Sequence, residues 1–365
     1  MSRPSPDAAR RHLSDLDYCR AALANGSRTF LAASRLLSRR ARDPAIALYA
    51  FCREADDIID AGGAGPQTLA LLSERLDGIY SGTPKQNPAD RAFADVVNRF
   101  EIPRALPDAL IEGFAWDADG QRYETFRDVL GYATRVAGSV GAMMALIMGA
   151  RSASQLARAC DLGIAMQLSN IARDVGEDAR NGRIYLPLSW LREEGLDPDA
   201  WIRDPRPEPR IAKAVERLLD AADTLYMRAE RGIACLPLGS RAGIFAARFI
   251  YAEIGNEVRR NGFDSVTTRA IVSGRRKVEL AAMAAGAAGR SLLSAQVHIA
   301  ERVEEAAYLV DAVGPLSRTG LDTAWWNLPA RTARVIEIFE RLERDEREIR
   351  RIRAGIGREP AASRA

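Results

Sequence analysis

Carboxylate side chains recur at helical spacing in two separate segments. Asp56 and Asp60 stand four residues apart, and Asn170, Asp174 and Asp178 repeat that interval over two turns. On a helix this spacing places the side chains on one face, one turn apart. Apolar residues surround the first pair, and buried carboxylates are costly unless cations neutralise them. Because carboxylate and amide oxygens suit Mg²⁺, we predict that both stripes hold divalent cations.

A single acidic stripe would more often be the solvated edge of a helix. Two stripes on largely apolar helices, each beside an arginine (Arg53 and Arg173), form a more specific constellation. It suits the ionisation of a prenyl diphosphate, because Mg²⁺ and guanidinium groups can together hold the charge of a departing diphosphate. Arg28 and Arg269 are further candidates for phosphate contacts.

The allylic cation left by that ionisation needs an apolar pocket that excludes water and offers aromatic faces. The segment VAGSVGAMMALIMGA (136–150) predicts a helix of small and flexible apolar residues. Small side chains leave room for a long hydrocarbon, and they also suit tight packing between helices. Both interpretations stay open at this point.

Helices are the elements that must position these residues. Of the 365 residues, 47% are apolar, and apolar residues return every three or four positions in most long segments. Short clusters of Pro, Gly and Asp separate these segments, and no alternating strand pattern of useful length is present. The sequence therefore predicts an all-α protein of roughly ten or more helices.

Composition argues against several other kinds of site and partner. The four cysteines form no CxxC pair and the only histidines are His12 and His298, so oxygen ligands for Mg²⁺, or Mn²⁺ as an alternative, are favoured over a zinc site. The 52 basic and 49 acidic residues are spread along the chain, which argues against a nucleic-acid partner. The N-terminus has no signal-peptide pattern, and the longest uncharged stretch, 136–150, is shorter than the ~20 residues of a membrane span. We therefore expect a soluble, cytoplasmic protein.

The C-terminal segment differs from the rest of the chain. Residues 329–365 hold ten arginines and seven acidic residues, which accounts for the net charge of +3. Trp325 and Trp326 precede an amphipathic helix that is predicted to begin near Arg331. Such a helix either packs on the protein's own body or makes peripheral, reversible contact with the inner face of an anionic membrane.

Five motifs, in order along the chain, resemble those of the squalene/phytoene synthase family. They are GSRTF from Gly26, YAFCREADDIID from Tyr49, YATRVAGSVG from Tyr132, QLSNIARDVGEDARNGRIYLP from Gln167 and YAEIGNEVRRNGFD from Tyr251. The likeness is greatest to bacterial phytoene synthases. It predicts an N-terminal segment (1–20), a head-to-head prenyl synthase domain (21–305) and a C-terminal helical extension (306–365). Glu54 departs from the family pattern, and its position off the Asp56/Asp60 face predicts little effect.

The resemblance implies an isoprenoid-synthase bundle around a central cavity, with the two acidic helices facing each other across its mouth. It implies metal ligands or their close supports at Asp56, Asp60, Asn170, Asp174 and Asp178, and a catalytic role for the four aspartates and Tyr132. It also implies substrate contacts at Gly26, Ser27, Arg28, Thr29, Tyr49, Arg53, Asp117, Gln167, Asn170, Arg173, Tyr251 and Arg269.

The activity implied is head-to-head condensation of two geranylgeranyl diphosphates, through prephytoene diphosphate, to phytoene, the first committed step of carotenoid biosynthesis. No reductant is needed and no nicotinamide is expected. The first proton acceptor is either a tyrosine such as Tyr132 or the released diphosphate. One alternative is a C15-using enzyme that makes squalene, hydroxysqualene or dehydrosqualene. Another is a non-catalytic helical interaction protein of the same fold, which would have no reason to keep five metal-binding oxygens at helical spacing.

Overall fold

The computed structural model describes residues 6–26, 34, 37–62, 65–292 and 301–314, and within these ranges the chain forms helices and no strand. The first half contains α1 (Pro6–Gly26), α3 (Arg39–Gly62), α4 (Pro66–Ser81), α5 (Pro88–Phe100), α6 (Ala105–Ala118), α7 (Phe126–Ala133), the π-helix η1 (Thr134–Gly138) and α8 (Ser139–Ile147). The second half contains α9 (Ala153–Arg180), α10 (Leu188–Glu193), α11 (Pro198–Arg203), α12 (Pro209–Ile233), α13 (Leu238–Arg260), α14 (Gly274–Arg290), the 3₁₀ helix η2 (Glu304–Ala306) and α15 (Ala307–Ala312). The predicted all-α class is confirmed.

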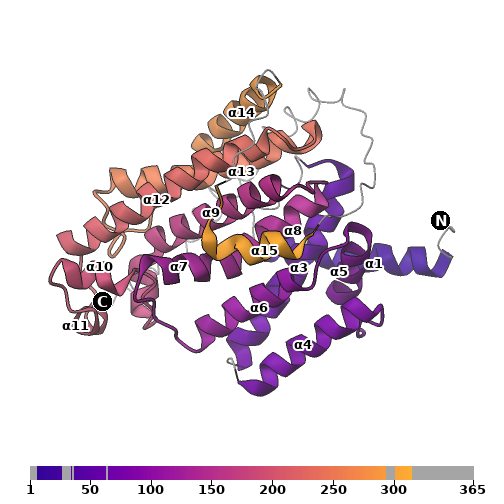
Figure 1. The fold of residues 1–365 in the computed structure, drawn as a ribbon, viewed down its shortest axis with the longest axis horizontal. Coiled ribbons are helices and arrows are strands. Elements are labelled where there is room, and N and C mark those ends of the chain that lie inside the picture. Colours follow the sequence, from indigo (N-terminus) through magenta and orange to yellow (C-terminus); the bar gives the residue numbers. More distant parts are fainter. Residues whose placement is uncertain (1–5, 27–33, 35–36, 63–64, 293–300, 315–365) are drawn as a thin grey trace, which may run out of the picture.

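Helix α9 lies at the centre of the bundle. It packs against α12 and α13 on one side and against α7, η1 and α8 on the other (Figure 1). Its N-terminus is fixed by a capping box, in which the Ser152 hydroxyl accepts from the Gln155 amide and the Gln155 side chain accepts from the Ser152 amide. Because α9 also carries Asn170, Asp174 and Asp178, its placement decides where the second oxygen stripe lies.

Two glycines bring η1 and α8 into close contact with α9. A Cβ atom at Gly141 would lie 2.4 Å from the Ala159 carbonyl oxygen, and one at Gly163 would lie 2.2 Å from the Ala137 carbonyl oxygen. Larger side chains at either glycine would push the two backbones apart. The small residues of 136–150 therefore serve close helix packing, as one of the two interpretations predicted.

Glu54 joins α3 to three other helices. Its carboxylate accepts from Tyr18 Oη of α1 at 2.8 Å, from Arg75 Nη2 of α4 at 2.8 Å and from Asn87 Nδ2, the N-cap of α5, at 2.6 Å. Arg75 also pairs with Asp90 at 2.6 Å, and both side chains are at least 95% buried. The prediction that Glu54 has little effect did not include these contacts, which join the helix that carries Asp56 and Asp60 to α1, α4 and α5.

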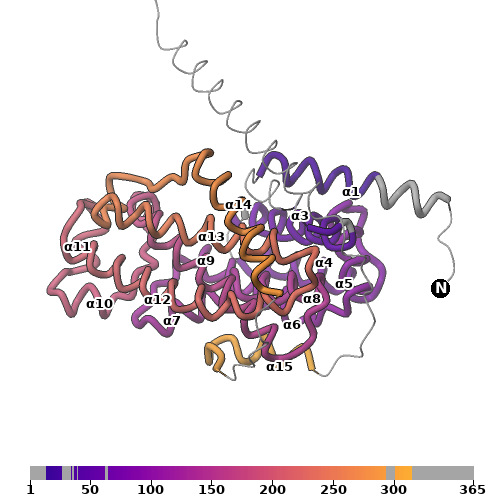
Figure 2. Tube along the Cα trace, turned by 90° about the horizontal axis from the view of Figure 1, so that it is seen from above, coloured from indigo at the N-terminus to yellow at the C-terminus, as the bar shows by residue number. Residues whose placement is uncertain are grey.

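The predicted division of the chain meets the structure at two points. Position 20 lies within α1, which packs against α3 and α5, and position 305 lies within η2. The short α15 that follows packs against α6, α8 and α9 (Figure 2). Trp325, Trp326 and the helix predicted from Arg331 lie outside the described residues. The three-part division therefore stays a prediction.

Among the described helices, one run is long and apolar enough to cross a membrane, Phe126–Ile147. Within the molecule, 61% of its most apolar window is buried. The core helix of a soluble protein meets the same two criteria, and this run packs against α6 and α9.

We predict that Asp90→Asn lowers the free energy of unfolding by about 3 kcal/mol, because it removes a buried carboxylate from the Arg75 guanidinium. Glu74→Gln is the control, since its ion pair with Lys85 is exposed and should contribute less than about 1 kcal/mol. Urea unfolding followed by circular dichroism measures both. Equal small losses would show that the buried network does not stabilise the bundle.

Candidate active site

The first oxygen stripe lies on the C-terminal half of α3. Asp56 is half-buried and Asp60 is exposed. Burial, and then repulsion from Asp60, raises the pKa of Asp56 to about 6. Arg53 lies beside this stripe, with Nη2 2.9 Å from Asp57 Oδ1 and Nη1 3.8 Å from Asp56 Oδ2. One arginine therefore does not balance the negative charge at this end of α3.

The second stripe contains two carboxylates in different electrostatic environments. Burial disfavours the charge on Asp174, yet hydrogen bonds from Arg173 and Arg269 hold the pKa of its carboxyl below the ordinary value. Arg173 Nη2 and Arg269 Nε lie 2.5 and 2.8 Å from the two Asp174 oxygens. Among the residues that the structure describes, no arginine donates a hydrogen bond to Asp178, one turn further, and burial with repulsion from Asp174 raises its pKa to about 7.

A loop after α13 brings Arg269 to this stripe. The Ser265 carbonyl accepts from the Gly176 amide at 2.9 Å, and a Cβ atom at Gly176 would lie 2.2 Å from the Val266 carbonyl oxygen. Asp264 Oδ1 accepts from the Val266 and Thr267 amides at 3.0 and 2.9 Å and shapes the turn. Because Gly176 has no side chain, the loop can approach α9 this closely.

Asp117, near the end of α6, joins the two stripes electrostatically. Its two carboxylate oxygens accept from Tyr132 Oη and Tyr185 Oη, each at 2.6 Å. Burial raises the pKa of Asp117 despite these two hydrogen bonds. The charge of Asp117 also contributes to the raised pKa values of Asp56 on α3 and Asp178 on α9. The carboxylates of three helices therefore share one electrostatic region.

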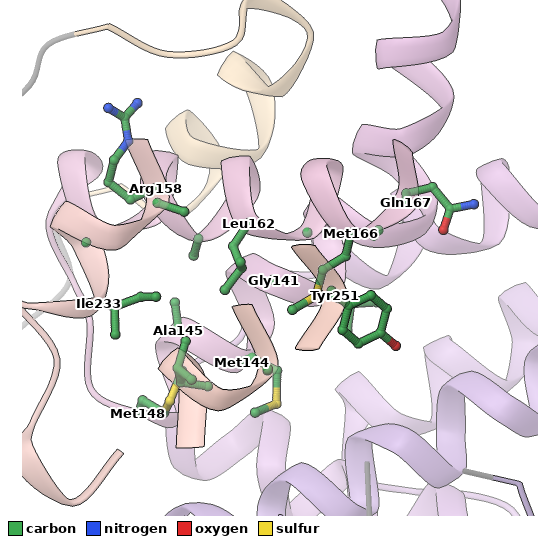
Figure 3. A pocket seen from close by; sticks show the side chains of 18 of the residues that line it. Gly141, Met144, Ala145, Met148, Arg158, Leu162, Met166, Gln167, Ile233 and Tyr251 are labelled. Carbon is green, nitrogen blue, oxygen red and sulfur yellow. The ribbon is translucent and has the colours of Figure 1, made fainter. Parts of the chain in front are cut away.

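An apolar cavity of about 320 Å³ extends from this region into the bundle. Tyr49, Gln167, Asn170 and Tyr251 line the end nearest the acidic residues. Figure 3 shows Arg158, Leu162 and Met166 along one wall, with Met144 and Met148 opposite. Seven of the residues in 136–150 line the cavity: Val136, Ala137, Val140, Gly141, Met144, Ala145 and Met148. This segment therefore both packs closely and leaves room, as both interpretations predicted.

The donor set fits Mg²⁺ bound together with a diphosphate. Within the described part of the chain, no three His, Cys, Asp or Glu side chains lie close enough to enclose an ion by themselves. Mg²⁺ in phosphate-transfer sites is commonly held by one or two carboxylates together with substrate oxygens, which is what the pairs Asp56/Asp60 and Asp174/Asp178 offer. Burial, followed by repulsion from neighbouring carboxylates, raises the pKa values of Asp56 and Asp178, and a bound cation would favour the charged form of both.

The structure brings together most of the residues predicted from the sequence. Gly26 ends α1 beside the Tyr49 side chain, where a Cβ atom would lie 2.3 Å from Tyr49 Oη. Arg269 lies at Asp174, and Tyr132 lies at Asp117. Ser27, Arg28 and Thr29 lie outside the described residues.

Two residues of the site were not predicted, Tyr185 and Arg183. Tyr185 stacks on Tyr132 with ring centroids 5.2 Å apart and supplies the second hydrogen bond to Asp117. Burial lowers the pKa of the Arg183 guanidinium, but the negative charges around it, those of Asp117 and Asp60 among them, outweigh burial and raise the pKa. Both residues lie in RIYLP, the end of the fourth motif. Their position a few residues after Asp178 was the signal in the sequence that could have placed them in the site.

Comparison with known proteins agrees with this geometry. The squalene/phytoene synthase family model matches residues 23–281. The chain is 53% identical to the phytoene synthase of Rhodobacter capsulatus, over 82% of this chain and 89% of that protein. It is 41% identical to a 15-cis-phytoene synthase of a Paracoccus species, over 74% and 91%.

Two solved structures of squalene and dehydrosqualene synthases have a fold similar to that of this chain. The crystal structure of a dehydrosqualene synthase in complex with a ligand superposes with a TM-score of 0.69 at 31% identity, over 76% of this chain and 97% of that one. The squalene synthase HpnC from Alicyclobacillus acidocaldarius gives a TM-score of 0.64 at 26% identity. With the acidic stripes on α3 and α9 and an apolar cavity walled mainly by η1, α8, α9, α12 and α13, the chain belongs to the squalene/phytoene synthase family.

Proposed function

We propose that this protein is a phytoene synthase, a prenyltransferase that condenses two geranylgeranyl diphosphates head to head and commits isoprenoids to carotenoid biosynthesis. The relatives at 53% and 52% identity, from Rhodobacter capsulatus and Cereibacter sphaeroides, are both phytoene synthases. The observation that carries the choice of substrate is the length of the cavity.

The cavity is long enough for a C20 chain. Asn170 and Gln155 both line it, and a helix rises 1.5 Å per residue, so it extends about 22 Å along α9. A fully extended polypeptide advances about 3.6 Å over the three backbone bonds of one residue, which is about 1.2 Å per bond. An extended prenyl chain advances by about the same length per bond. On that scale the four isoprene units of a geranylgeranyl chain span roughly 19 Å, and the three of a farnesyl chain span roughly 14 Å.

The residues at the mouth suit ionisation of the first substrate. Bound Mg²⁺ would neutralise diphosphate charge and so make the group a better leaving group. Arg173 and Arg269 lie where their guanidinium groups can hold phosphate oxygens. Tyr49 and Tyr251 present aromatic rings where the allylic cation forms, and the apolar walls keep water away from it.

A condensation and then a rearrangement follow from this ionisation. The double bond of the second substrate attacks C1 of the cation, and loss of a proton closes the cyclopropane of prephytoene diphosphate. A second ionisation, rearrangement and proton loss give phytoene without a reductant. Tyr132 donates its hydroxyl hydrogen to Asp117, and burial raises its pKa well above the ordinary value. Tyr132 is therefore a neutral phenol that orients Asp117, which favours the released diphosphate as the proton acceptor.

The second candidate is a C15-using enzyme, favoured by the dehydrosqualene synthase structure at 31% identity. The two candidates differ in product. We predict that the purified protein converts geranylgeranyl diphosphate with Mg²⁺, and without any reductant, to phytoene, identified by mass spectrometry after extraction. EDTA should abolish the reaction. If the protein converts farnesyl diphosphate and does not convert geranylgeranyl diphosphate, the C15 enzyme is favoured instead.

We predict that Asp56→Asn and Asp178→Asn lower turnover at least ~10²-fold and also remove the rise in melting temperature that Mg²⁺ with inorganic diphosphate produces in the native protein. Each substitution removes a ligand charge but also a repulsion, so the melting temperature without Mg²⁺ should not fall. Glu216→Gln, at an exposed position on α12, is the charge-matched control. A full Mg²⁺ response in either aspartate variant would contradict the assignment of these ligands.

We further propose that the protein is cytoplasmic and makes reversible contact with the inner face of a membrane through its basic C-terminal segment, because its substrates and product carry long hydrocarbon chains. Each cation near an anionic surface contributes about 1 kcal/mol before the acidic residues of the segment oppose it. The full chain should co-sediment with anionic liposomes at low salt more than a chain ending at Asn327 does. Equal binding by both would remove this role for the C-terminal segment.

A further inference from the structure

The lining of the cavity changes with depth along α9. Measured from Asn170, Leu162 lies about 12 Å deep, Ala159 about 16 Å and Gln155 about 22 Å. A C15 chain that begins beside Asn170 ends at roughly 14 Å, whereas a C20 chain reaches roughly 19 Å. Ala159 and Arg158, the latter about 18 Å deep, are therefore the α9 lining residues that only the longer chain passes, and Ala159 is the one with a small side chain.

Small side chains border this part of the cavity. Ala159 is half-buried although its neighbours Arg158 and Cys160 are buried, because its side chain borders the open space. On α8, Gly141 contacts the Ala159 carbonyl, and Ala145 lies one turn deeper and also lines the cavity. By contrast, Leu162 and Met166 line the shallower part. The cavity therefore keeps free space where the fourth isoprene unit would lie.

The wall around Ala159 is held in place by buried charges. Arg158 Nε lies 2.9 Å from Asp161 Oδ2, and Arg228 Nε lies 3.1 Å from the same oxygen. Arg228 and Arg158 both donate to the Glu301 carbonyl, which ties the start of the segment before α15 to this wall. A Cβ atom at Gly232 would lie 2.3 Å from Arg158 Cβ, so α12 presses directly on this turn of α9. An added side chain at position 159 must therefore occupy the cavity and cannot displace the wall.

We propose that Ala159, together with Ala145 on α8, determines the chain length that this cavity accepts: their small side chains admit the fourth isoprene unit. This inference rests on the proposed function. It predicts that bulk at position 159 excludes the C20 chain and leaves room for the C15 chain. Ala159 thus acts on specificity and takes no part in the ionisation at the mouth.

The test measures binding, separately from turnover. The dissociation constants of geranylgeranyl and farnesyl thiolodiphosphates, which resist ionisation, are measured with Mg²⁺ for the native protein, Ala159→Leu and Ala159→Phe. Ala153→Phe is the matched control, because Ala153 is exposed in the first turn of the same helix. Ala145→Leu provides a second position should Ala159→Phe fail to fold, which thermal unfolding detects.

We expect both substitutions at Ala159 to weaken binding of the C20 analogue at least tenfold and to change binding of the C15 analogue less than threefold. Ala153→Phe should change neither. Unaltered C20 binding in Ala159→Leu and Ala145→Leu, or equal loss of both analogues, would overturn the inference. Failure of the proposed function is distinguishable, because it would appear in the native protein as no phytoene from geranylgeranyl diphosphate.

Discussion

The structure depends on keeping several carboxylates together at the mouth of an apolar cavity. Asp56, Asp117 and Asp178 come from three helices, and burial, with repulsion from neighbouring carboxylates, raises the pKa of each. Such an arrangement persists only if the surrounding fold holds the helices against that repulsion. In the proposed function this charge has a use, because diphosphate would bring Mg²⁺ to the same place and the two sets of oxygens would share the cations.

The helices that carry the charge are held by contacts on their opposite faces. Glu54 of α3 forms a part-buried ion pair with Arg75 of α4, away from the Asp56 face. On α9, Gly163 seats the helix against η1, and Gly176 seats the Arg269 loop against it. Helix α9 therefore has two parts along its length, since its C-terminal half carries the predicted oxygen ligands and its N-terminal half forms a wall of the cavity.

The parts of the site that repeat with helical period could be predicted from the sequence. The spacing of Asp56 with Asp60, and of Asn170 with Asp174 and Asp178, predicts shared faces, and the small residues of 136–150 predict room for hydrocarbon. The hydrogen bond of Tyr185 to Asp117 was not predictable, because it depends on how the loop after α9 returns to α6. The contacts of Glu54 were missed for a similar reason: position on one helix does not reveal partners on α1, α4 and α5.

The central claim is that the two acidic stripes and the cavity form one site, with the diphosphate at the mouth and the prenyl chain inside. A crystal structure with Mn²⁺ and geranylgeranyl thiolodiphosphate tests it most directly, because anomalous scattering locates the ions. We predict Mn²⁺ at about 2.1 Å from carboxylate oxygens of the Asp56/Asp60 and Asp174/Asp178 pairs, with the end of the chain beside Ala145 and Ala159. Ions bound elsewhere, or a prenyl chain outside the cavity, would contradict the account.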